Sequence, residues 1–568
     1  MPKLILFAIS LVIASTIAVN AQLKIDGRLA VLDSTTNTYL CPTTIVNFGA
    51  PQEFEVTYEG LTDVKIDGNA VASGTTHTFA AITGGKSWTI EAMDGDTPIN
   101  RQLTFTYLPV MVLNGTFGNE YTNATIQLLD PDDYTDELML SQVKWRGATS
   151  NTEGKNKRNY HIKFIDETGA KMDRRFFGLR KDNSWIMDAG QVDFLRVRNR
   201  VATELWNDMC TKPYYADLEP QAKTGVDGQW VEVILNGRYV GLYALTEAID
   251  RKLLKIKKFD EITKEIHGQI WKSKLYTSTT TFNIFVPYNN NLAEWAGFET
   301  KYPELDEVSP TNYKLLGDCV SLGDTATQAQ FNEKAHLLFD MPVMIDYEIF
   351  TQALLTIDNH GKNIYWFTYD RETAPTISLA VWDLDTSMGG NWTTEAFHPS
   401  TVSPTRKLTS ANTVFGRMTY PDSRYYRQCI QRYHELRKDV LSTDSLIARY
   451  THAVEHIDKC GAIDREQARW SRDTDLSRRE LNIRSELAYV TNWIKTRMDF
   501  LDNSRYKEPL TGDVNVDGVV DIADVNAAIN VILTSNWLEN PIADTNGDET
   551  VDIADVNKII NIILNTDK

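Results

Sequence analysis

Four oxygen-bearing side chains lie close together in the stretch 351–390, and their types and spacing indicate a site for a divalent cation. An Asp-x-x-x-x-Asn motif precedes an Asp-x-Asp motif, and the positions are Asp358, Asn363, Asp383 and Asp385. Carboxylate and amide oxygens are hard ligands that suit Mg²⁺ or Mn²⁺. Crowded carboxylates repel one another unless a cation neutralises them. The alternative is that these residues only cap turns, where Asp and Asn are common.

A β-hairpin is expected to position these side chains. Residues 363–369 (NIYWFTY) and 376–382 (TISLAVW) are rich in β-branched and aromatic residues, and a polar turn separates them. With Thr373 at the centre of the turn, antiparallel pairing places Asn363 opposite Asp383. Asp358 lies in the loop that enters the first strand, so one hairpin gathers the whole set.

The spacing matches the chemistry of protein kinases. In those enzymes one Asp accepts the proton of the substrate hydroxyl, while an Asn and a later Asp hold metal ions on the phosphates. This logic makes Asp358 the catalytic base and makes Asn363 and Asp383 metal ligands, with Asp385 as the second choice. Two other functions stay open: a silent structural or glycan-binding module, and a glycoside hydrolase using Asp383 and Asp385 as its carboxylate pair.

Several separated segments resemble the CotH-type atypical protein kinases, a family named for a spore-coat protein. The matching segments occur in the same order, and the resemblance covers residues 108–505; they are KNKRNYHIKF (155–164), RNRVATEL (198–205), VILNGRYVGLYALTEAI (233–249), DNHGKN (358–363) and WDLDTSMGG (382–390). The resemblance implies transfer of the γ-phosphoryl group of ATP to a Ser or Thr hydroxyl, with Mg²⁺ or Mn²⁺.

The resemblance also implies a nucleotide side of the site. The loop between two expected strands carries Gly147, Gly154, Lys155 and Lys157 and would cover the phosphates. Lys163 on the following strand would be the catalytic lysine that contacts phosphate. Its partner would be Glu204 on an amphipathic helix over 192–209. An exposed strand lysine and a solvated glutamate are the alternatives.

Composition limits the broad class of protein. With 568 residues, 42 % of them hydrophobic, and 13 Trp, the chain is long enough for about three or four domains. Its formal net charge of −19 argues against nucleic acid as the main partner. The 5 Cys have no metal-type spacing, and their odd number leaves at least one unpaired within the chain.

The N-terminal residues predict an exported protein with a β-rich first domain. An apolar run after Lys3 ends in small residues and reads as a signal peptide over 1–21, which implies a secreted protein that is not integral to the membrane. The alternative is a membrane anchor, but Ser and Thr interrupt the run and it is short for a span. Short alternating segments separated by Gly, Asp and Asn turns follow over 22–107, and they predict a β-sandwich of immunoglobulin type.

The C-terminal tail contains an internal repeat. GDVNVDGVVDIADVNAAINVIL (512–533) recurs as ADTNGDETVDIADVNKIINIIL (543–564). Ca²⁺ needs about six to eight oxygens, and a loop with ligands at alternate positions can supply them. The first copy offers Asp513, Asn515, Asp517, Asp521, Asp524 and the Val519 carbonyl. The second offers Asp544, Asn546, Asp548, Asp552, Asp555 and the Thr550 carbonyl.

Two details of the loops point to one family. The twelfth position is Asp, whereas EF-hands use Glu, and each loop precedes a single helical stretch. The tail therefore resembles a type I dockerin, which implies docking onto a cohesin module of a scaffold in a cellulosome-type polysaccharide-degrading complex. Gly518 suits the sharp turn at the sixth position, whereas Glu549 in the second copy does not.

These observations predict a multidomain α+β protein. The expected parts are a signal peptide (1–21), an immunoglobulin-like β-sandwich (22–107), a kinase-like α+β domain with a helical C-terminal part (108–505) and a small all-α, paired EF-hand-like dockerin (506–568).

Overall fold

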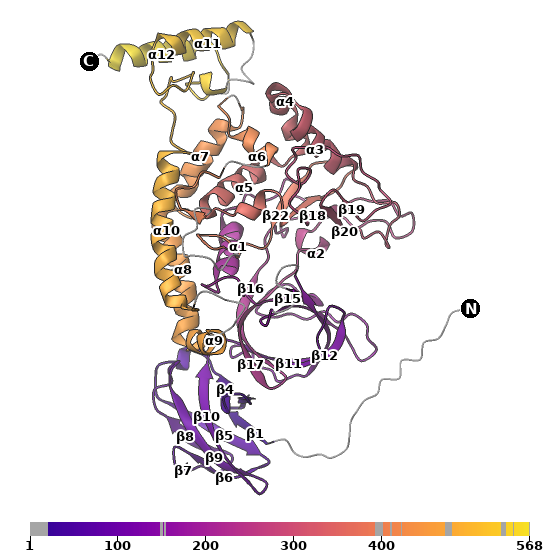
Figure 1. Cartoon of the computed structure of the whole chain (residues 1–568), viewed down its shortest axis with the longest axis vertical. Helices are drawn as coiled ribbons and strands as arrows, with labels where there is room; N and C mark the ends of the chain where they lie inside the picture. Colours follow the sequence, from indigo (N-terminus) through magenta and orange to yellow (C-terminus); the bar gives the residue numbers. More distant parts are fainter. Residues whose placement is uncertain are drawn as a thin grey trace.

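The structure is a computed structural model that describes residues 21–147, 151–152, 155–391, 402–408, 412–421, 423–471, 480–534, 541–548 and 550–566. The molecule is elongated, with stacked β-sheets at one end, a barrel and a helical region in the middle, and a helix pair at the other end (Figure 1). This mixture confirms the α+β class. The expected signal peptide, apart from Ala21, lies outside the described residues.

The first part is built from two sheets around an aromatic core. Phe54, Phe79, Trp88 and Phe105 meet there with ring centroids 5.3–6.0 Å apart. One sheet has the order β2 (Arg28–Leu29), β1 (Gln22–Ile25), β5 (Gln52–Glu59), β8 (Thr75–Phe79). The other has the order β3 (Val31–Asp33), β4 (Thr38–Pro42), β10 (Thr97–Thr106), β9 (Ser87–Asp94), β6 (Leu61–Ile66), β7 (Asn69–Ala70).

A closed seven-stranded barrel follows. Its strand order is β11 (Val110–Gly115), β12 (Thr122–Leu129), β13 (Met139–Arg146), β14 (Asn159–Phe164), β15 (Ser184–Asp188), β17 (Arg238–Thr246), β16 (Gly228–Leu235). Apolar side chains such as Ile126, Ile162 and Trp185 fill its interior. The predicted tight hairpin between β16 and β17 is confirmed, because Leu235 pairs with Arg238 and Asn236 and Gly237 both adopt positive φ angles.

The second sheet of the larger region carries the hairpin that organises the predicted site. Its order is β19 (Glu294–Trp295), β20 (Phe298–Tyr302), β18 (Gln269–Ser273), β21 (Ile364–Thr368), β22 (Ser378–Val381). The helices around it are α1 (Arg198–Met209), α2 (Arg251–Leu254), α3 (Lys314–Thr325), α4 (Gln328–Leu338), α5 (Met341–Leu354), α6 (Thr413–Met418), α7 (Tyr426–Arg437), α8 (Thr443–Lys459), α9 (Ala462–Trp470) and α10 (Ile483–Asn503). The C-terminal pair is α11 (Ile522–Thr534) and α12 (Ile553–Thr566).

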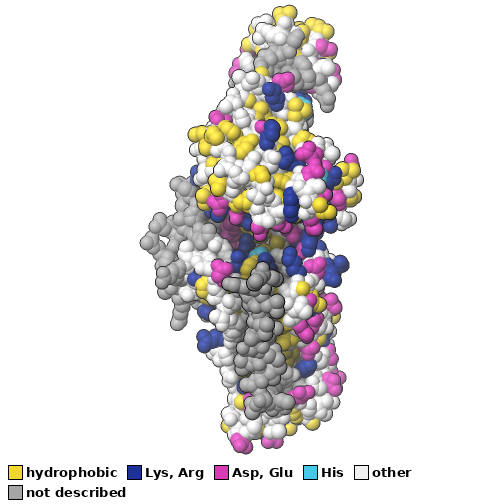
Figure 2. Space-filling view, turned by 90° about the vertical axis from the view of Figure 1, so that its right-hand side faces the viewer, with side chains coloured by type: hydrophobic (Ala, Val, Ile, Leu, Met, Phe, Trp, Pro, Cys, Tyr) yellow, Lys and Arg dark blue, Asp and Glu magenta, His cyan; other side chains and the backbone are white. Residues whose placement is uncertain are grey.

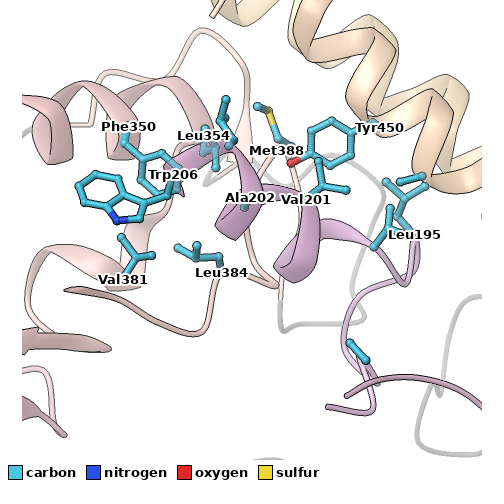
Figure 3. Packing of buried hydrophobic residues seen from close by; sticks show 14 of the residues in the cluster. Leu195, Val201, Ala202, Trp206, Phe350, Leu354, Val381, Leu384, Met388 and Tyr450 are labelled. Atoms are coloured by element: carbon cyan, nitrogen blue, oxygen red, sulfur yellow. The ribbon is translucent and has the colours of Figure 1, made fainter. Parts of the chain in front are cut away.

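The main apolar core lies where α1, α5 and the end of the β21–β22 hairpin meet. Trp206 of α1 packs edge-on against Phe350 of α5, with ring centroids 5.3 Å apart. Figure 3 shows Val381, the last residue of β22, and Leu384, three residues later, beside these residues and Leu354. The core therefore anchors the backbone on which the Asp-x-Asp motif lies.

Two details of the secondary structure differ from the sequence prediction. In the hairpin Ile364 pairs with Val381, which aligns Asn363 with Trp382 and not with Asp383. The turn closes earlier than predicted because the Asp370 carboxylate accepts hydrogen bonds from the Glu372 amide and the Thr373 hydroxyl.

The predicted helix over 192–209 begins only at Arg198. Asp193 accepts hydrogen bonds from the backbone amides of Leu195 and Arg198, at 2.8 and 2.7 Å. Arg196 takes a positive φ of 65°. Both features form a turn in place of the first two helical turns.

Polar and apolar contacts both join the first β-sheets to the barrel, where Leu40 packs with Val110 and Ile234. The Ser34 amide donates to the Gly237 carbonyl at 2.8 Å and the Tyr239 amide donates to Asp33 at 3.0 Å, which ties the first β-sheets to the barrel. None of the helices within the described residues has the length and apolar character that crossing a membrane requires. All five cysteines are described and none forms a disulfide.

A buried ionic cluster joins the barrel to α9. Glu466 accepts from Lys157 at 2.8 Å, from Arg196 at 2.7 Å and from the Leu242 amide at 2.8 Å. Lys157 and Glu466 are almost fully buried, and burial lowers the pKa of Lys157 to about 8 although Glu466 opposes this. Lys157, expected in a phosphate-covering loop, is therefore occupied by a structural contact.

Replacing Glu466 tests this cluster. Glu466→Ala would leave two buried cations without their anion, so we expect a loss of roughly 3–5 kcal/mol in unfolding free energy. Asp464→Ala, on the exposed side of the same helix, is the matched control and should change it by less than about 0.5 kcal/mol. Thermal and denaturant unfolding measure both. Equal effects of the two variants would show that the buried cluster adds no special stability.

Candidate active site

The loop between α5 and β21 presents the first pair of predicted residues. The 3-10 turn Ile357–His360 carries Asp358, whose Oδ2 accepts from the Asn363 side-chain amide at 3.3 Å and lies 3.3 Å from the Lys362 ammonium. Buried neighbours hold this loop, because Asn359 donates to the Trp382 carbonyl at 2.9 Å. The structure therefore brings Asp358 and Asn363 together, as the spacing predicted.

The Asp-x-Asp motif lies directly after β22. Leu384 is fully buried in the core shown in Figure 3, whereas the flanking Asp383 is exposed and Asp385 is half-buried. Asp383 and Asn363 both adopt positive φ angles, 60° and 59°. Asp and Asn tolerate this conformation better than other residues with a side chain, and such backbone is frequent at functional sites.

Asn199 connects the motif to the barrel. Its side-chain amide nitrogen donates to Asp188 Oδ2 at 2.6 Å, and its amide oxygen accepts from the Leu384 backbone nitrogen at 3.0 Å. Asp188 ends β15, and Asn199 lies in the first turn of α1. One side chain therefore fixes the distance between a barrel strand and the acidic motif.

The acidic groups influence one another strongly. Burial raises the pKa of Asp385 well above its usual range, and the carboxylates of Asp383, Asp188, Asp193 and Asp358 raise it further. The Asp383 side chain is partly exposed to solvent, but the protein around its other sides desolvates the carboxylate, and this raises its pKa. Such mutual repulsion is the condition that a bound cation relieves.

Basic residues approach the same carboxylates from other elements. Lys272 of β18, Arg146 of β13 and Lys362 each oppose the rise in the pKa of Asp383. The Arg146 guanidinium lies over the Trp382 ring, 5.0 Å from its centroid. Figure 2 shows basic and acidic side chains around the hollow between the barrel and the upper part of the molecule.

Lys163 belongs to a second basic group on the outer face of the barrel. The Lys144 and Lys163 ammonium groups lie over the Tyr121 ring, 4.6 and 4.5 Å from its centroid. Burial lowers the pKa of the neighbouring His161 to about 3, and Arg146, Lys163 and Lys144 contribute. Arg146 acts on the pKa of both His161 and Asp383, so the positive charge near Lys163 is linked to that near the carboxylates.

The remaining predicted residues on the nucleotide side are not all brought together. Glu204 lies on α1 but pairs with Arg200 at 2.9 Å, and within the described residues Lys163 has no carboxylate within ion-pair distance. The expected Lys163–Glu204 pair is therefore not formed, because residue 200 on the same helix supplies the closer cation. Gly147 is exposed with a φ of 107°, and Lys155 is half-buried. Gly154 lies outside the described residues.

The donor set suits a hard cation shared with a ligand. Within the residues that the structure describes, no three His, Cys, Asp or Glu side chains are grouped so that they could hold a metal ion alone. Mg²⁺ is typically bound by one or two carboxylates together with substrate phosphates, so a site completed by a nucleotide fits this arrangement. Asn363, Asp383 and Asp385 are the residues that could hold it.

Asp188, Asn199, Arg146 and Lys272 were not predicted from the sequence. A signal existed for Asp188, since it follows the apolar strand SWIM as Asp383 follows SLAVW. No comparable pattern marks Asn199, whose role depends on two partners distant in sequence.

The two C-terminal loops repeat one geometry. Asp524 Oδ1 accepts from the amides of Val514 and Asn515 at 2.7 and 3.0 Å. Asp555 Oδ1 accepts from Thr545 and Asn546 at the same distances. In each copy the twelfth-position Asp is buried and closes its loop, and Glu549 lies outside the described residues.

Comparison with protein families identifies the larger region. The family model described as CotH kinase protein matches residues 143–501, which contain the Asp358 loop, the Asp-x-Asp motif, α1 and Lys163. No curated protein matches the chain.

The carboxylate repulsion predicts a pH-dependent stability difference. Because the pKa of Asp385 is raised in the folded state, the wild type loses stability as pH rises from the unfolded-state pKa near 4. Asp385→Asn, which stays neutral, should therefore melt higher than wild type at pH 8 and equally at pH 4, without Mg²⁺ or Mn²⁺. Asp439→Asn, at an exposed position, is the control and should follow wild type at both pH values. An equal gap at both pH values for Asp385→Asn would contradict the prediction.

Proposed function

This chain belongs to the CotH kinase protein family, and from that premise we propose that it is a metal-dependent protein kinase acting on Ser or Thr hydroxyls of secreted proteins. The observation that carries the proposal is the convergence of Asp358, Asn363 and the Asp383–Asp385 motif. These carboxylates are close enough to raise the pKa of Asp385, and basic side chains surround them.

The geometry supports distinct roles within the set. Asp358 is the general base that accepts the hydroxyl proton, and the Asn363 amide and Lys362 ammonium orient its carboxylate. Because Asn363 donates its amide nitrogen to Asp358, its amide oxygen remains available as a metal ligand beside Asp383. Bound Mg²⁺ or Mn²⁺ with ATP supplies the phosphoryl group and neutralises phosphate charge. Asp385 is the second-choice ligand.

Basic side chains on the barrel suit a polyphosphate. Arg146 acts on the pKa of Asp383, and Arg146, Lys144 and Lys163 all act on the pKa of His161, so these cations belong to one region of positive charge. A triphosphate whose metal-bound end lies at Asp383 would extend along them, with Gly147 and Lys155 at the loop above. Lys163 lies within the residues that the family model matches. Its expected partner Glu204 pairs with Arg200.

The C-terminal helix pair supports a second function, anchoring. We propose that its two loops bind Ca²⁺ and that the module is a type I dockerin that docks onto a cohesin of a polysaccharide-degrading scaffold. Matched positions of the two copies expose apolar side chains, Ile522 with Ile553 and Leu533 with Leu564. Two similar exposed faces on one small module favour binding to a protein partner. The proposed export rests on residues 1–21 of the sequence.

Phosphoryl transfer is the direct test of the kinase. Pure protein with Mn²⁺ or Mg²⁺ and labelled ATP should label itself or an acceptor protein. Asp358→Asn should slow the transfer by roughly 10²–10⁴-fold, the usual contribution of a general base. Asp383→Ala should abolish metal-dependent transfer, and Asp439→Asn should leave it unchanged.

A silent structural or glycan-binding module is the competing function. It would show no label transfer by wild type with any metal, and no thermal shift with Mg-ATP. Both results together would overturn the kinase proposal.

Calcium titration tests the C-terminal module. Calorimetry should find two sites in wild type and one in each of Asp524→Ala and Asp555→Ala, because each substitution removes the carboxylate that closes one loop. Asn526→Ala, exposed on α11 and outside the loop, should retain both sites. Two remaining sites in either loop variant would contradict the assignment.

A further inference from the structure

A cavity of about 260 Å³ lies between α5, α7 and the end of α10, and none of its lining residues belongs to the candidate active site. Leu408, Ile430 and Phe500 supply apolar walls, and Gln352 and Tyr506 supply polar groups. One water occupies about 30 Å³ in the liquid, so the space exceeds that of one or two bridging waters.

Two buried side chains in this wall each have one hydrogen-bonding group that lacks a partner among the described residues. Gln352 uses its amide nitrogen on Glu348 and on the Leu408 carbonyl, both at 3.0 Å, and its amide oxygen remains unpaired. The Tyr506 hydroxyl lies beside the Arg505 guanidinium, which can only donate to it, and no acceptor for the hydroxyl proton lies within the described residues. Both residues are about 99 % buried, so leaving these atoms unpaired is costly.

The buried charges at the cavity are already balanced, and Lys407, the other lining residue with a charge, is exposed to solvent. The Arg505 guanidinium forms an ion pair with Glu348, which is fully buried, and also donates to the Thr419 hydroxyl at 3.3 Å. A charged ligand would therefore place a charge against this buried wall without an oppositely charged partner. The unpaired atoms instead require a neutral molecule that both donates and accepts hydrogen bonds.

The apolar walls complete the description of the ligand. A hydroxyl group can donate to Gln352 and accept from Tyr506, while carbon-rich faces of a ring can pack on Phe500 and Ile430. We propose that this cavity is a binding site for a neutral sugar ring, a free monosaccharide or a terminal residue of a glycan. The site is independent of the proposed phosphoryl transfer.

Calorimetry and thermal shift with the full chain test the site. D-glucose, D-xylose and D-galactose are the neutral probes, and D-glucuronate and D-glucosamine are matched charged probes. At least one neutral sugar should bind saturably, and its charged counterparts should bind at least roughly 10-fold more weakly, because a buried charge needs a partner.

Two variants locate the binding. Tyr506→Phe should weaken it roughly 3- to 10-fold, the effect of one neutral hydrogen bond donated by the hydroxyl. Ser504→Trp, at an exposed lining position, should block the cavity and abolish binding while the Tm and phosphoryl transfer stay unchanged.

Three results would overturn the proposal. They are no saturable binding of any neutral probe, equal binding of neutral and charged probes, and binding that persists in Ser504→Trp. The first would leave a cavity that holds only water, and the last would place the sugar elsewhere on the chain.

Discussion

The side chain of Asn199 holds the candidate active site together, because it contacts both halves of it. Its amide nitrogen is bonded to Asp188 at the end of a barrel strand, and its amide oxygen is bonded to the backbone between Asp383 and Asp385. An amide offers a donor and an acceptor at fixed separation, so it can set a distance between two elements. This contact helps to set the position of the acidic motif relative to the barrel, together with the Arg146–Trp382 contact.

The elements that carry Asn199 are rigid for separate reasons. Arg198, its neighbour on α1, is buried and pairs with Asp193 and with Glu486 of α10. Trp206, two turns further along α1, packs on α5. The acidic site therefore rests on an ionic contact at the start of α1 and an aromatic core near its end, and this support sustains the repulsion between the carboxylates.

The balance of buried charge distinguishes the active site from other regions of the chain. At Glu466 and at Arg505 buried charges are matched by opposite charges, which makes these groups structural. At Asp383 and Asp385 like charges are held together, which favours a cation. Unpaired polar atoms in an apolar cavity form a third case, in which the missing partner is a neutral molecule. The balance of charge at each place thus indicates the chemistry it can support.

Local pattern was enough to predict some of this protein, and long-range packing determined the remainder. The Asn236–Gly237 turn, the mixed α+β class and the approach of Asp358 to Asn363 depend on residues close in sequence, so the sequence alone determined them. The hairpin register was predicted one residue out, because side-chain bonds from Asp370 closed the turn. Only the tertiary structure decided that Lys157 is buried on Glu466, that Glu204 pairs with Arg200, and that Asp188 and Asn199 join the site. Most of these contacts link residues far apart in the chain, and in the case of Glu204 a cation on the same helix is its partner. Their energies depend on distances in space, which the spacing of residues along a sequence does not give.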